Sequence, residues 1–140
     1  MKTLPFAFFA SAVICVTVGM GLGIFMGASG DHSYAETHAH LNLVGWATLA
    51  LFGIYYELTP QAARTRLARV HYVVAVIGVV ILVPGIAIVT HGGTELFSSV
   101  GSLMTAGSML IFLFIVFRHG FGARETTRGM ASDIRPQPAE

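Results

Sequence analysis

Four long stretches without a charged residue decide what this 140-residue chain can fold into. A helix that crosses a bilayer needs about 20 mostly apolar residues, and each uncharged stretch has 20 to 28. Only 11% of the residues are charged, whereas a soluble domain carries about 25%. We therefore predict an all-α membrane protein with four transmembrane helices. The uncharged stretches are residues 3–30, 37–56, 70–94 and 96–117.

Residues between these stretches predict where the helices begin and end. Ser33 and Glu36 match the S-x-x-E capping box, with Ser33 as the N-cap of the second helix. Pro60 should end that helix. The first stretch is longer than the roughly 7–15 apolar residues of a signal peptide, so we expect a retained helix. The helices are expected over residues 5–29, 34–57, 69–91 and 95–118, as one domain over 1–118 before a polar tail over 119–140.

Glycine and proline add expectations about packing. Gly19, Gly23 and Gly27 follow one another at four-residue steps in the first helix. Such steps favour close helix packing, and a second interpretation is a groove where a flat cofactor lies against the backbone. Pro84 and Gly85 should kink the third helix.

The basic residues predict how the chain crosses the membrane. All eight lysines and arginines fall on one side of the four helices, whereas the opposite connections carry only Asp31, Glu36 and Glu95. The positive-inside rule then places both termini in the cytoplasm of a bacterial-type inner (plasma) membrane. The net charge of +1 provides no basic surface for nucleic acid. We therefore expect the lipid bilayer, and not nucleic acid, as the surroundings of the chain.

Three of the six histidines, His38, His40 and His91, fall near the outer ends of predicted spans. Ionisable side chains within a span are costly and are usually functional. Side chains two positions apart on an α-helix point about 200° away from each other. His38 and His40 therefore cannot hold one metal ion from a regular helix. Haem iron suits them better, because its two axial ligands approach from opposite sides of a flat ring.

Simpler roles for the histidines compete with ligation. His38 and His40 could form hydrogen bonds between helices, and His91 could interact with the carbonyl end of its helix. His32 should be a solvated loop residue. His71 and His119 adjoin arginines and are expected to be polar residues at the cytoplasmic interface.

Residues 37–46, with the sequence THAHLNLVGW, carry a resemblance to a known family. The segment resembles the haem-ligand helix, with its H-x-H pair, in the main subunit of haem–copper oxidases and nitric oxide reductases. That subunit has twelve helices in three four-helix repeats, and this chain corresponds to one repeat. The resemblance implies a homotrimer in which His38 of one protomer faces His40 of the next. A single histidine, His91, stands where the family has a copper-ligating pair.

These observations predict a b-type haem protein of the membrane. His38 and His40 are the expected axial ligands, and His91 is an alternative ligand or a polar group near a haem propionate. Because a bis-histidine iron is coordinatively full, we expect electron transfer without a complete oxygen-reducing centre, and not an enzyme. The chain has no C-x-x-C-H motif for covalent haem attachment. A respiratory-chain protein or a quinol would be the redox partner.

Two other functions remain open from the sequence. One is a non-haem copper or zinc site built from His38, His40 and His91 with Glu36 or Glu95. The other is an accessory or assembly subunit of a respiratory oxidase that has no cofactor of its own.

Overall fold

The computed structural model describes residues 3–123 and confirms the predicted all-α membrane architecture. Within the described residues, four helical spans are long and apolar enough to cross a membrane. They are α1 (Leu4–Ser29), a second span over Ala35–Leu58, α5 (Arg66–Thr90) and α6 (Leu96–His119). The predicted polar tail over 119–140 lies outside the described residues from residue 124 onward.

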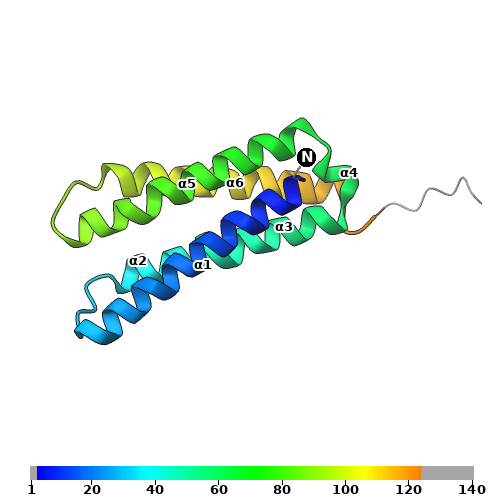
Figure 1. The fold of residues 1–140 in the computed structure, drawn as a ribbon. Helices are drawn as coiled ribbons and strands as arrows, with labels where there is room; N and C mark the ends of the chain where they lie inside the picture. The colour runs from blue at the N-terminus through cyan, green and yellow to red at the C-terminus, as the bar shows by residue number, and fades with distance from the viewer. Residues whose placement is uncertain (1–2, 124–140) are drawn as a thin grey trace, which may run out of the picture.

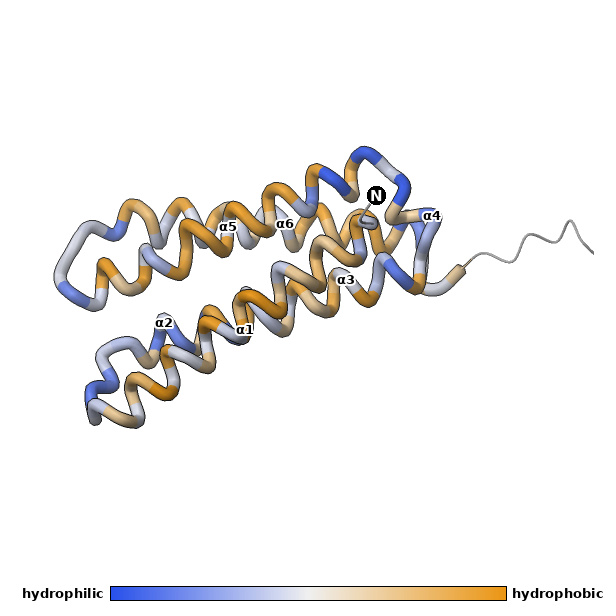
Figure 2. The backbone as a smooth tube through the Cα atoms, in the orientation of Figure 1, coloured by the Kyte–Doolittle hydropathy of each residue, from blue (hydrophilic) through white to orange (hydrophobic). Residues whose placement is uncertain are grey.

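The spans are arranged as two antiparallel hairpins, α1 with the second span and α5 with α6 (Figure 1). A short helix, α4 (Pro60–Ala63), connects the hairpins. The hairpins come together at the end of the bundle that holds α4 and the start of α1, which we call the terminal end. The opposite end, the loop end, holds residues 30–34 and 91–95, and there α2 (Ala35–His40) contacts α5. Polar residues gather at these two ends and apolar residues lie between them (Figure 2).

An aromatic cluster near the terminal end joins the two hairpins. Phe8 of α1 stacks on Tyr56 with ring centroids 5.5 Å apart, and Phe52 meets Phe112 of α6 at 4.5 Å. Phe8, Phe52 and Tyr56 are at most 2% exposed. Aromatic pairs contribute about 0.5–1.5 kcal/mol beyond their buried area. The best-packed part of the protein is therefore at the terminal end, away from the predicted ligand histidines.

The second span is not the regular α-helix that the sequence suggested. It consists of α2 (Ala35–His40), a π-helical segment η1 (Leu41–Thr48) and α3 (Leu49–Leu58). The Asn42 side chain donates to the His38 carbonyl at 2.8 Å, which in an α-helix would accept the Asn42 backbone N–H. The Thr48 hydroxyl donates to the Leu43 carbonyl, five residues back, at 2.8 Å. Side-chain hydrogen bonds to backbone carbonyls therefore occur near both ends of the π-helical segment.

Two helix boundaries differ from the predicted ones, because the residues there form other hydrogen bonds than expected. The capping-box prediction is wrong, because α2 begins at Ala35 and the buried Ser33 hydroxyl has no hydrogen-bond partner among residues 3–123. The Ser33 backbone N–H instead donates to Asp31 at 2.9 Å, which lowers the pKa of the Asp31 carboxyl. α5 begins at Arg66, earlier than the predicted residue 69, because the Thr65 hydroxyl accepts from the backbone of the first turn.

Glycines allow α5 and α6 to pack closely along their length. A Cβ atom on Gly101 would lie 2.5 Å from the Cα of Leu82, and one on Gly85 would lie 2.5 Å from the Ser98 nitrogen. Both distances are far inside van der Waals contact, so only glycine fits there. α5 continues through Pro84 to Thr90 as one helix.

Candidate functional site

The three predicted ligand histidines lie at the loop end, and their hydrogen bonds fix which ring nitrogen carries the proton. In each, Nδ1 lies within hydrogen-bond distance of a backbone carbonyl. A carbonyl only accepts, so each contact requires the tautomer in which Nδ1 donates its N–H. The carbonyls are those of Gly19 for His38 at 3.0 Å, Glu36 for His40 at 2.9 Å and Ala87 for His91 at 2.8 Å.

His38 is half-buried between α2 and α1. A Cβ on Gly23 would lie 3.1 Å from His38 Cε1, and one on Gly19 would lie 2.8 Å from the Asn42 amide. The Asn42 amide nitrogen is 3.4 Å from both ring nitrogens of His38. Close helix packing is therefore confirmed at Gly19 and Gly23, which seat His38 and Asn42. A Cβ on Gly27 would meet nothing within 4 Å.

His40 and His91 are exposed. Their Nε2 atoms form no hydrogen bond within residues 3–123. The His91 ring lies 4.9 Å from the Tyr34 ring, so the end of α5 meets the start of α2. α2 is a regular helix through His40, which turns His40 away from the side where His38 contacts α1.

The donor set fits haem iron better than a compact metal site. No group of three or more histidine, cysteine, aspartate or glutamate side chains that could hold a metal ion is found among the described residues. Axial ligation of haem needs one imidazole nitrogen on each side of the ring. Ligating histidines almost always donate their other N–H to a carbonyl, carboxylate or water. His38, His40 and His91 all meet that condition.

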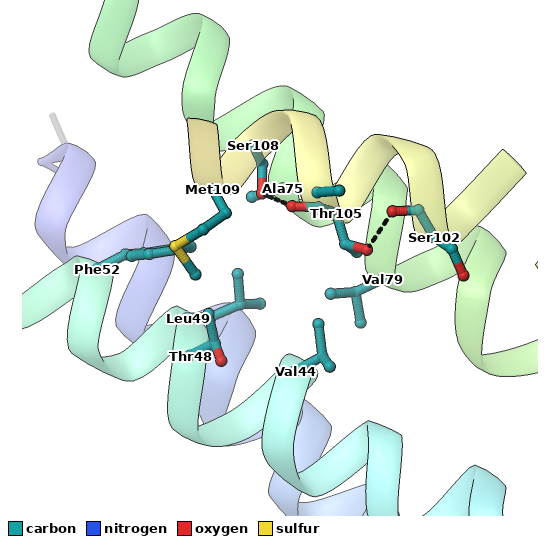
Figure 3. A pocket seen from close by; sticks show the side chains of 11 residues that line it. Val44, Thr48, Leu49, Phe52, Ala75, Val79, Ser102, Thr105, Ser108 and Met109 are labelled. Atoms are coloured by element: carbon teal, nitrogen blue, oxygen red, sulfur yellow. Dashed lines mark hydrogen bonds between the residues drawn. The ribbon is translucent and has the colours of Figure 1, made fainter. Parts of the chain in front are cut away.

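An apolar groove separates the hairpins between the loop end and the aromatic cluster (Figure 3). Its volume is about 280 Å³, and its walls come from η1 and α3 on one side and α5 and α6 on the other. The hydroxyls of Thr105 and Ser108 donate to carbonyls of α6 at 2.9 Å. Val44, four residues after His40, lines the groove, and Phe52 and Met109 also line it. The second span therefore has an open apolar surface beyond His40.

His71 is a buried polar residue that the sequence analysis placed wrongly. It is 0% exposed, not interfacial, and its ring stacks on Phe112 with centroids 5.5 Å apart. Its Nδ1 pairs with the Tyr56 hydroxyl at 2.9 Å, and its Nε2 is buried without a partner in the described residues. The small residues Ala68 and Ala75, on the same helix face, were the signal for a buried position.

Comparisons of the chain with protein-family models, curated proteins and solved structures found no match.

Proposed function

We propose that this multi-pass membrane protein binds haem b through loop-end histidines and carries electrons in the membrane. The supporting observation is that three imidazoles place Nδ1 2.8–3.0 Å from backbone carbonyls, and that Nε2 of His40 and of His91 has no hydrogen-bond partner among the described residues. A hydrogen bond at Nδ1 orients the ring, as the outer-shell hydrogen bonds of ligating histidines do. Haem, when bound, supplies an iron that accepts and returns one electron.

The ligand pairs come from different protomers in this proposal. His38 contacts α1 and His40 is exposed on another side of the same helix, so the two cannot serve one iron. A homotrimer brings His38 of one protomer opposite His40 of the next. His91 lies beside Tyr34 and is an alternative ligand or a polar group near a propionate.

The homotrimer predicts a particle mass. A chain of 14.9 kDa should migrate as three copies when its mass is measured in mild detergent with the detergent contribution subtracted. Three copies are expected because each haem needs imidazoles from two neighbours in a closed ring. A population consisting only of single chains would contradict the shared sites.

The charge distribution supports an orientation for electron exchange. The described arginines, Arg64, Arg66, Arg69 and Arg118, lie at the terminal end, and the described loop-end connections carry acidic residues and no lysine or arginine. By the positive-inside rule, the terminal end is cytoplasmic. The histidines then lie near the outer face of the inner membrane, where a respiratory protein or a quinol would exchange electrons with the haem.

Substitution of the exposed ligand tests the proposal directly. His40→Ala removes one axial Nε2 and should lose most of the haem, measured as haem per chain after purification. His32→Ala is the matched control, because His32 is also exposed at the loop end and also bonds a carbonyl, that of Gly30, at 3.0 Å. His32→Ala should keep its haem. Full haem content and an unchanged low-spin spectrum in His40→Ala would exclude His40 as a ligand.

A further inference from the structure

A second candidate site lies at the opposite end of the bundle from the histidines. A cavity of about 590 Å³ opens at the terminal end between the start of α1, the end of α3, α4 and the start of α5. Its walls include Thr3, Pro5, Glu57, Arg64 and Arg69. Fully buried Tyr56 also contributes to the wall. This volume is typical of small-molecule sites, which span about 300–1,000 Å³.

The charged side chains of this cavity have no partners among residues 3–123. Arg64, Arg69 and Glu57 are exposed and form no ion pair or hydrogen bond with any other described residue. Two guanidinium groups face one carboxylate around the cavity, which leaves a net positive charge. Guanidinium groups bind phosphate through paired hydrogen bonds. The chemistry of the cavity therefore suits a phosphate group at the membrane interface.

An apolar groove extends from the same cavity along α1 and α3. It has a volume of about 300 Å³ and shares Thr3, Pro5 and Glu57 with the charged cavity. Further along, it is lined by Phe6, Phe9, Gly53 and Ile54. Phe6, Phe9 and Ile54 are 43–48% exposed. A phosphate group beside Arg64 and Arg69 would thus lie next to a surface that suits a hydrocarbon chain.

We infer that this composite surface binds an anionic phospholipid from the leaflet at the terminal end. The phosphate lies between Arg64 and Arg69, and one acyl chain follows the groove over Phe9 and Ile54. Basic pockets at the ends of transmembrane helices are known to recognise anionic headgroups. A free phosphate would leave the groove unused, and a zwitterionic lipid would not match the net positive charge.

The test measures lipid binding to the full chain in detergent by native mass spectrometry. Phosphatidylglycerol is titrated into wild-type protein, and the double variant Arg64→Gln/Arg69→Gln is compared with Arg66→Gln/Arg118→Gln. The second variant removes the same charge from the same end, at exposed positions outside both cavities. Because the first variant removes two guanidinium groups that would donate hydrogen bonds to the phosphate, it should bind about 30-fold more weakly. The second should lose less than about fivefold.

Three results would overturn the lipid site: equal weakening in both double variants, equal binding of phosphatidylcholine, or full competition by soluble glycerol phosphate. The first would indicate a general surface field, the second a site without charge selectivity, and the third an anion site that does not use the groove. If the double variant is not monodisperse, Arg64→Gln and Arg69→Gln are measured singly, each with an expected loss of about fivefold. Haem content is recorded in parallel, so failure of the lipid site and failure of the haem proposal are distinguished.

Discussion

At the scale of single residues, the Tyr56–His71 pair is the polar contact at the centre of the aromatic cluster. The hydroxyl and Nδ1 are 2.9 Å apart, and His71 is also packed against Phe52 at 4.5 Å between ring centroids. With Nε2 already unpaired, the imidazole depends on Tyr56 for its one hydrogen bond within the described chain. A buried polar group without a partner costs about 1–3 kcal/mol.

Removing that hydroxyl should therefore destabilise the protein. Tyr56→Phe keeps the ring stacking but leaves both nitrogens of His71 unpaired, so we expect a loss of about 1–2 kcal/mol in unfolding free energy. The measurement is unfolding by denaturing detergent from mixed micelles. Tyr34→Phe is the control, because the Tyr34 hydroxyl forms no hydrogen bond within the described residues. Equal stability of the two variants would show that the buried bond contributes nothing.

The positions of some residues could be predicted from the sequence, whereas the positions of others depend on contacts that the sequence pattern does not show. His38 and His40 fall inside a helix as expected, because the helix start is fixed to within a residue by the charged and polar stretch before it. The burial of His71 was missed, since it depends on Phe8 and Phe112 from two other helices and its own helix signals it only through Ala68 and Ala75. The same holds for Ser33, whose expected capping role was replaced by the bond between its backbone and Asp31.

At the scale of the helices, the close approach of α5 and α6 is the most demanding contact. Gly101→Ala would place a methyl group 2.5 Å from the backbone of Leu82. Because backbone cannot rotate away, the helices must separate, at a cost of about 1–3 kcal/mol. Gly107→Ala, on the same helix, adds a methyl group with nothing within 4 Å. Thermal unfolding should show a clear loss for the first variant only. A similar midpoint of thermal unfolding for both variants would mean that α5 and α6 do not pack as closely as described.

The four spans were predictable, whereas the π-helical segment was not. Charge placement alone gives the spans, because each uncharged run must cross the bilayer. The π-helical segment coincides with the hydrogen bond from Asn42 to the His38 carbonyl and with the contact of Asn42 with Gly19 of a neighbouring helix, which the sequence pattern does not reveal. π segments frequently occur at functional sites, and η1 begins directly after His40.

At the scale of the whole molecule, the buried aromatic cluster lies at one end of the bundle and the exposed histidines lie at the other (Figure 1). The aromatic cluster and the hydrogen bond from Tyr55 to the Gly120 carbonyl, at 2.7 Å, close the terminal end. At the loop end the His91 ring lies 4.9 Å from the Tyr34 ring, and His40 and His91 are exposed. The sequence predicts that His38, His40 and His91 lie at this end, and the pairing of these histidines between protomers is a proposal that no contact within one chain tests.

The central claim is that the loop-end histidines ligate haem. Its most direct test is the visible spectrum of the protein, oxidised and then reduced with dithionite, after haem-replete expression and purification in mild detergent. The account predicts a Soret band with sharp reduced α and β bands, the spectrum of a low-spin b-type haem, at about one haem per chain. A colourless protein from the same preparation would contradict it.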